Sequence, residues 1–251
     1  MHIDPSLLAG IGAIAFLYAS VGHGGASGYI AVLALAGFGA EQIRPLALEL
    51  NVVVAGLATA VYARAGHFQG DVFRPLALAA VPAALLGGAI HLPLAPLKQL
   101  LAVILLFSAW RLVAPKAEPP LLSPAPPKPA AIAGVGAGLG LLAGITGTGG
   151  GIFLTPWMVI RRWLPIRQAA AVSAAFILVN STSGLVGFGL SRGLGAIPSV
   201  AHIWPMAAAV LVCGGLGALA GSRWFPQAWI RGLLATVLVV ASLKLAGLAG
   251  S

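Results

Sequence analysis

Charged residues are scarce in this sequence. Only 8% of the 251 residues are Asp, Glu, Lys or Arg, whereas 59% are hydrophobic, and a soluble globular domain usually has about 25% charged residues. A helix that spans a bilayer needs about 20 mostly apolar residues, because the hydrocarbon core is roughly 30 Å thick. Apolar runs of this kind fill nearly the whole chain. We therefore exclude a soluble fold and predict an all-α polytopic integral membrane protein.

Cysteine and acidic residues are also few. Cys213 is the only cysteine, which excludes an intramolecular disulfide and a cysteine-rich metal site. Five acidic residues against 14 Lys and Arg leave a formal net charge of +9. The basic residues lie one to three at a time between apolar runs, as in proteins that they orient in a membrane, and this excludes nucleic acid as a partner. The sequence predicts no metal site and no cofactor.

Proline is concentrated in one stretch near the middle of the chain. Seven prolines lie between residues 115 and 129, and a segment so rich in proline forms an extended linker rather than a helix. We therefore predict a first transmembrane repeat over residues 1–114, a proline-rich linker over 115–129 and a second transmembrane repeat over 130–251.

The two halves resemble each other in sequence. The glycine cluster at residues 22–26 has a counterpart at 147–151, an offset of 125, and Asn51 has a counterpart in Asn180, an offset of 129. Small insertions in loops account for the drift in offset. Many transporter folds are built from such internal duplications, so we interpret the halves as homologous repeats.

Each half contains five apolar segments, of which the first two are too short to span a bilayer alone. In the first half they are Leu7–Val21, Gly28–Gly37, Pro45–Ala63, Val72–His91 and Leu97–Val113. In the second half they are Ala131–Ile145, Ile152–Arg161, Gln168–Leu190, Val200–Gly221 and Trp229–Leu248. A glycine cluster separates the two short segments of each half.

The short pair of each half either crosses the membrane once or turns back as a re-entrant hairpin. A single crossing distributes the 14 basic residues seven against seven between the two sides, whereas a hairpin distributes them ten against four. The positive-inside rule favours the uneven distribution. We therefore expect an inverted repeat, with each half made of a re-entrant pair and three spanning helices, both termini outside and the linker in the cytoplasm. Eight simple crossings in 4+4 parallel halves are the alternative.

The glycine clusters are the best candidates for a binding site. Each cluster precedes a short helix, and the free N–H groups and positive dipole at a helix start favour an anion that glycine lets approach closely. Buried asparagine amides either line such a site or tie helices together. The candidate substrate-binding residues are Gly22, His23, Gly24, Gly25, Ser27, Asn51, Thr146, Gly147, Thr148, Gly149, Gly150, Gly151, Asn180 and Ser181.

Two titratable residues are candidates for coupling transport to an ion gradient. His23 lies in the first glycine cluster and could titrate near neutral pH or donate to an oxyanion. Glu49 is the one acidic residue well inside an apolar run, where an ionisable group is a functional candidate by default. Since Arg44 lies five residues before Glu49, a structural ion pair is the alternative role for the glutamate.

The motifs resemble the TauE/SafE family of sulfite and organosulfonate exporters. The resemblance rests on the glycine-rich segment over residues 21–28, on Gly147–Gly151 with Pro156, and on residues 171–173 followed by Asn180 and Ser181. It spans essentially the whole chain. It implies a secondary carrier of sulfite, sulfoacetate or a related sulfonate, driven by an ion gradient. The histidine in the first cluster departs from the pattern.

The residues and the resemblance together predict a transporter in the inner membrane rather than an enzyme. We expect a small anion as substrate, the lipid bilayer and a coupling proton or sodium ion as partners, and a homodimer as one possible assembly. An anion channel is the first rival function. An intramembrane enzyme with Ser27 and His23, or Ser199 and His202, is the second, although neither pair has an acidic orienting residue close in sequence.

Overall fold

A computed structural model describes residues 4–20, 23–90, 94–113, 127–198 and 200–223, together with residues 239, 242, 243 and 246. Every regular element in these ranges is helical. The elements are α1 (Pro5–Ala19), α2 (Ala26–Leu35), α3 (Ala40–Arg64), α4 (Gly70–Ala89), α5 (Leu94–Val113), α6 (Pro129–Thr146), α7 (Gly151–Ile160), α8 (Ile166–Arg192), the 3₁₀ turn η1 (Leu194–Ala196) and α9 (Val200–Arg223).

The helices begin and end close to the predicted apolar segments. Five of the described helices are long and apolar enough to cross a membrane, within Glu41–Arg64, Gly70–Ala89, Pro129–Thr146, Arg167–Arg192 and Ile203–Ala220. The prediction of a polytopic α-helical membrane protein is confirmed. Most of the predicted segment Trp229–Leu248 and most of the linker lie outside the described residues, so the division into repeats stays a prediction.

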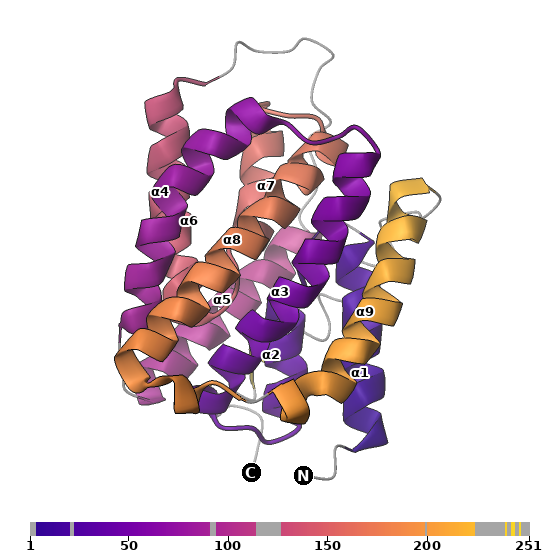
Figure 1. Ribbon diagram of the computed structural model, residues 1–251, viewed down its shortest axis with the longest axis vertical. Helices are drawn as coiled ribbons and strands as arrows, with labels where there is room; N and C mark the ends of the chain where they lie inside the picture. The colour runs from indigo at the N-terminus through magenta and orange to yellow at the C-terminus, as the bar shows by residue number, and fades with distance from the viewer. Residues whose placement is uncertain are drawn as a thin grey trace.

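The two short helices at the start of the chain pack against each other in opposite directions. Gly10 of α1 lies against Val32 of α2, and Gly28 of α2 lies against Ile14 and Tyr18 of α1. Figure 1 shows α1 rising from the end of the molecule that carries the N-terminus and α2 returning to that end, where α3 begins. Helices α1 and α2 therefore form a hairpin whose tip lies inside the molecule.

The second pair of short helices opens toward the other end of the molecule. In Figure 1, α6 begins at the end opposite to the N-terminus, and α7 returns to that end, where α8 begins. The ends of α3 and α9 and the start of α4 also lie there. The described basic residues are concentrated in these terminal turns, at positions 64, 74, 128, 161, 162 and 167.

The main helix pairs of the bundle each join one helix of the first half to one helix of the second half. Helix α6 packs on α4, and α1 packs on α9, while α3 and α8 contact each other between these two pairs. If the halves are matched as repeats, α1 corresponds to α6 and α4 to α9. The opening helix of each half is then packed on the fourth helix of the other half.

Small residues allow these paired helices to approach closely. A methyl group added to Gly136 or Gly140 of α6 would lie 2.5 Å from Leu76 O or 2.6 Å from Ala80 O of α4. On the other side of the molecule, a methyl group on Gly12 of α1 would lie 3.0 Å from the Sγ atom of Cys213 of α9. Since lipid offers no hydrophobic drive for helices to associate, close van der Waals packing of this kind stabilises membrane bundles.

Candidate functional site

The tip between α6 and α7 has a backbone that only glycine adopts easily. Gly147, Gly149 and Gly150 have φ angles of 77°, 70° and 77°, in the left-handed region that residues with a Cβ atom rarely enter. A methyl group on Gly149 would lie 2.6 Å from Asn51 Nδ2 and 3.1 Å from Ser181 Oγ. The second tip therefore touches the asparagine side chain of the first half directly.

The tip between α1 and α2 reaches the same asparagine from the other side of its amide. A methyl group on Gly24 would lie 2.9 Å from Asn51 Oδ1 and 2.8 Å from Ile177 Cγ2. The next residue, Gly25, has a φ of 101° and lies against the Tyr29 side chain. The amide of Asn51 thus has its oxygen toward the first tip and its nitrogen toward the second.

We call Gly24, Asn51, Gly149 and Ser181 the central cluster; Asn180 precedes Ser181 on α8. The Nδ2 atom of Asn51 donates to Ser181 Oγ at 3.3 Å, which joins α3 to α8. Both asparagines and Ser181 are fully buried. Asn51 Oδ1 and both amide atoms of Asn180 have no hydrogen-bond partner among the described residues.

Unpartnered buried amides are costly, so they point to a functional role. Leaving a buried donor or acceptor unpaired costs roughly 1–3 kcal/mol, and native proteins contain few such groups. The starts of α2 and α7, at Ala26 and Gly151, immediately follow the two tips. Their first N–H groups have no partner within the helix, and they carry the positive end of its dipole. The arrangement can hold a small ligand that accepts hydrogen bonds.

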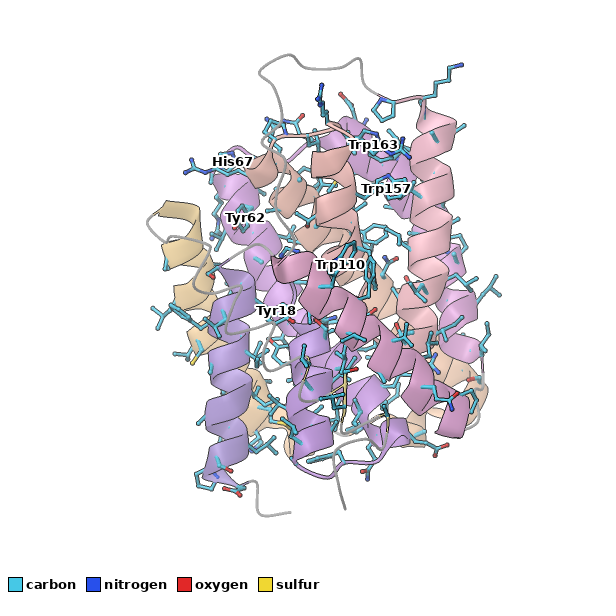
Figure 2. The ribbon with its side chains drawn as sticks, turned by 180° about the vertical axis from the view of Figure 1, so that it is seen from behind. Tyr18, Tyr62, His67, Trp110, Trp157 and Trp163 are labelled. Atoms are coloured by element: carbon cyan, nitrogen blue, oxygen red, sulfur yellow. The ribbon has the colours of Figure 1, made fainter. Side chains whose placement is uncertain are left out.

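The predicted hydroxyl donors take different partners. Ser27 Oγ shares a 2.8 Å hydrogen bond with Tyr18 OH, near mid-height of the molecule in Figure 2. Thr146 Oγ1 donates to Leu142 O of its own helix and lies 2.9 Å from Thr148 Oγ1. None of these contacts reaches the central cluster directly, so the three hydroxyls support the tips.

Two other sequence predictions are only partly covered by the structure. Gly22 lies outside the described residues. His23 is half-buried, and its backbone N–H donates to Tyr18 O at 3.0 Å. Of the rival enzyme pairs, Ser199 and the side chain of His202 lie outside the described residues.

Arg44 forms no ion pair with Glu49 in the described residues, so the alternative role of Glu49 as the partner of Arg44 in a structural ion pair is wrong. The Arg44 guanidinium donates to four backbone carbonyls at the ends of α4 and α6, at distances of 2.7–3.1 Å. These are the carbonyls of Gly87, Gly88, Ile90 and Gly144. A cation suits such a position because helix C-terminal ends carry unpaired carbonyls and partial negative charge. Five residues along a helix turn by about 140°, which separates the two side chains.

Glu49 lies at the wall of a cavity instead. The cavity has a volume of about 1450 Å³ and is bounded by residues of α1, α2, α3, α8, η1 and α9. The Glu49 side chain is 9% exposed, and its Oε2 atom has no hydrogen-bond partner among the described residues. The one salt bridge found in the described ranges joins Arg192 to Glu41 at 3.5 Å.

Sequence reasoning missed two features of the site. The carbonyl network of Arg44 depends on partners about 43 to 100 residues away in the chain, so no local pattern points to it. Tyr29, whose hydroxyl is buried without a hydrogen-bond partner in the described structure, lies one helical turn after Gly25. That spacing is a signal that could have identified it.

Comparison with known proteins identifies the family of the chain. The family model described as "Sulfite exporter TauE/SafE" matches residues 6–245. The chain is 39% identical over 236 residues to a protein of Sinorhizobium fredii (strain NBRC 101917 / NGR234) named "Probable membrane transporter protein y4hK", and the match covers 92% of this chain and 94% of that protein. No solved structure matches the chain.

Proposed function

The chain is a membrane transporter of the TauE/SafE sulfite exporter family, and we propose that it carries a small sulfur-containing anion across the inner membrane by alternating access. Sulfite, sulfoacetate and related sulfonates are the proposed substrates. The observation that carries the proposal is the position of Asn51, whose buried amide is touched by both glycine tips.

The proposed binding site consists of the central cluster and the helix starts beside it. An anion held there accepts hydrogen bonds from asparagine amides, from Ser181 and from backbone N–H groups at Gly24–Gly25 and Gly149–Gly151, with the dipoles of α2 and α7 adding to the attraction. Glycine lets the backbone approach the ligand closely. The proposed site is made mainly of neutral hydrogen-bond donors. Such donors favour a small anion of low charge, and they bind it weakly enough for it to be released on the other side.

The two hairpins support the proposal of an inverted repeat. They open toward opposite ends of the molecule, and their tips meet at one asparagine. Re-entrant backbone is tolerated at membrane depth where protein or a water-filled cavity surrounds it. In transporters built this way, one repeat rearranges against the other around a central site, which here exposes the anion first to one side and then to the other.

The distribution of basic residues supports an orientation. The turns at the linker end carry more Lys and Arg among the described residues than the turns at the N-terminal end. By the positive-inside rule the linker end faces the cytoplasm. In the proposed orientation both termini lie outside, and the cavity that contains Glu49 opens to the outside.

Flux into proteoliposomes tests the proposal. Purified protein is supplied with sulfite, thiosulfate, sulfate, sulfoacetate or acetate, each with and without a pH gradient, and protein-free liposomes give the baseline. Saturable movement of a sulfur oxyanion with accumulation against its gradient is the expected result. Saturable movement without accumulation would favour a channel, and movement of none of these anions would contradict the substrate assignment.

A further inference from the structure

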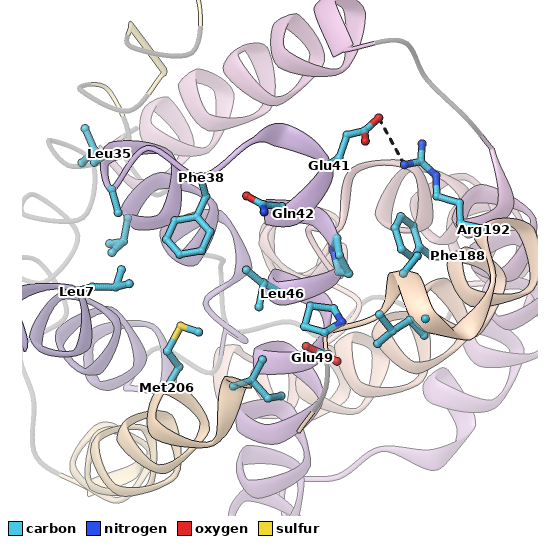
Figure 3. A pocket seen from close by; sticks show the side chains of 18 of the residues that line it. Leu7, Leu35, Phe38, Glu41, Gln42, Leu46, Glu49, Phe188, Arg192 and Met206 are labelled. Carbon is cyan, nitrogen blue, oxygen red and sulfur yellow. Dashed lines mark ion pairs between the residues drawn. The ribbon is translucent and has the colours of Figure 1, made fainter. Parts of the chain in front are cut away.

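A cavity at the N-terminal end of the molecule approaches the membrane-embedded part of α3. Its lining includes the exposed residues Asp4, Glu41 and Gln42, at the starts of α1 and α3, which mark its mouth, and the half-buried Arg192 at the end of α8. In Figure 3, the Glu41–Arg192 pair stands to one side of the cavity, and Glu49 lies beyond Leu46. Of the α3 residues that line the cavity, Glu49 is the farthest from the start of the helix.

Glu49 is a buried carboxyl group without a compensating charge. Its Oε2 atom has no partner in the described residues. The charged residues that line the same cavity are Asp4, Glu41 and Arg192, and the cation of that group is paired with Glu41. The lining residues from α2, α9 and η1 are uncharged. An unpaired carboxylate in apolar surroundings is strongly disfavoured, whereas the neutral acid is tolerated.

The cavity and the central cluster lie on different faces of α3. Gln42, Leu46 and Glu49 are spaced by four and three residues and line the cavity. Arg44, Leu48 and Asn51 have the same spacing and contact the second half, since Gly147, Gly184 and Gly149 lie against them. Residues two apart on a helix point about 200° apart. Glu49 and Asn51 are therefore neighbours in sequence with separate surroundings.

We propose that Glu49 is a proton-binding site, distinct from the anion site, through which transport is coupled to the proton gradient. The proposal rests on the proposed transport function. While the cavity is open, the carboxylate takes a proton from water, and one O–H bond forms at the carboxylate. When α3 moves and the cavity closes, the neutral acid is carried with it, and the proton returns to water when the site opens to the other side.

The two sites have one moving element in common. Because Glu49 and Asn51 lie on the same helix, a movement of α3 that exposes one site also moves the other. The anion does not need to touch the proton for the two to be coupled. Glu41 lies eight residues before Glu49 on α3, about 12 Å along the helix axis, and the described residues contain no group of acidic, histidine or cysteine side chains that could hold a metal ion. The Glu49 carboxyl group therefore suits a proton better than a metal cation, which requires several oxygen ligands.

Replacement of Glu49 by glutamine tests the proposal, because glutamine is an uncharged side chain of the same size that does not alternate between a protonated and an ionised form. Two assays use sulfite in proteoliposomes: exchange of labelled for unlabelled anion at equal pH on both sides, and accumulation driven by an imposed pH gradient. For Glu49→Gln we expect exchange within about twofold of wild type and no accumulation above protein-free liposomes. Glu41→Gln, at the exposed mouth, is the matched control and should accumulate as wild type does.

Accumulation by Glu49→Gln at the wild-type level would overturn the proposal, as would wild-type accumulation driven by a sodium gradient alone. If Glu49→Gln loses exchange as well, Glu49→Asp decides, because aspartate keeps a titratable carboxyl group. Retention of both activities by Glu49→Asp supports the proton site, and their loss overturns it. If wild type exchanges neither sulfite nor any of the other sulfur anions named above, the proposed transport function is contradicted instead, and this result is distinct from a failure of coupling.

Discussion

The two faces of α3 differ in what surrounds their buried polar side chains. One face presents Asn51 to both glycine tips in a buried polar cluster, where Asn51 Oδ1 has no hydrogen-bond partner among the described residues. The other presents Glu49 to an open cavity of about 1450 Å³. The first is suited to hold an anion through neutral donors, and the second to exchange a proton with water. The difference indicates that one helix separates binding from coupling while moving both together.

The largest effect is expected from filling the second tip. Gly150→Val should abolish flux, because valine is strained at a φ of 77° and its Cβ atom would lie 3.0 Å from Phe176 Cε1. Gly66→Val is the control, since Gly66 has a φ of 76° with nothing within 4 Å. Both variants should insert equally well. Flux by Gly150→Val at the level of Gly66→Val would contradict a role for the second tip in transport.

Removal of the shared amide should have the next largest effect. Asn51→Leu keeps the approximate size of the side chain and deletes the hydrogen bond to Ser181 and the group between the tips. We expect transport to fall by about tenfold to a hundredfold, because lost hydrogen bonds at a buried site cost roughly 1–3 kcal/mol. Thr59→Val is the control on the same helix, since the Thr59 hydroxyl bonds only to its own turn. Equal flux in the two variants would contradict a role for Asn51 in binding.

The carbonyl network of Arg44 should affect stability more than mechanism. Arg44→Met removes the guanidinium that donates to four carbonyls at the ends of α4 and α6, and the midpoint of thermal unfolding in detergent should shift down by roughly 5–10 °C. Arg192→Met removes a cation that is paired with Glu41 at 3.5 Å and lies 5.2 Å from the centroid of the Phe188 ring, and it should shift the midpoint by less than about 3 °C. Equal shifts would show that the buried network contributes no more than the surface pair.

The smallest effect on flux is expected from cysteine probes of the two faces. Cys213 is the only cysteine, so a Cys213→Ser background permits single probes. Leu46→Cys lines the cavity and should react with a membrane-impermeant thiol reagent added on the N-terminal side, whereas Leu48→Cys, which is fully buried on the other face, should stay unmodified. Modification of both, or of neither, would contradict the separation of the faces.

Much of the fold follows from the sequence because apolar length and glycine clusters are local signals. The glycine clusters at the two hairpin tips and the candidate asparagine at position 51 could be singled out by comparing the two halves of the sequence. Spatial relations between distant segments could not. The alternative pairing of Arg44 with Glu49 failed because the arginine meets Gly144 O, 100 residues away. The cavity beside Glu49 likewise depends on how α8, η1 and α9 pack, which no single segment encodes.

A direct measurement of sulfite binding tests most simply whether the anion site lies between the two glycine tips. Equilibrium dialysis of labelled sulfite is measured with the purified wild type, Gly149→Ala and Gly66→Ala. The two variants bear similar backbone strain, at φ angles of 70° and 76°, but only the alanine at 149 places a methyl group 2.6 Å from Asn51 Nδ2. We predict saturable binding by wild type and Gly66→Ala and none by Gly149→Ala. Equal binding by all three proteins would contradict the anion site between the two tips.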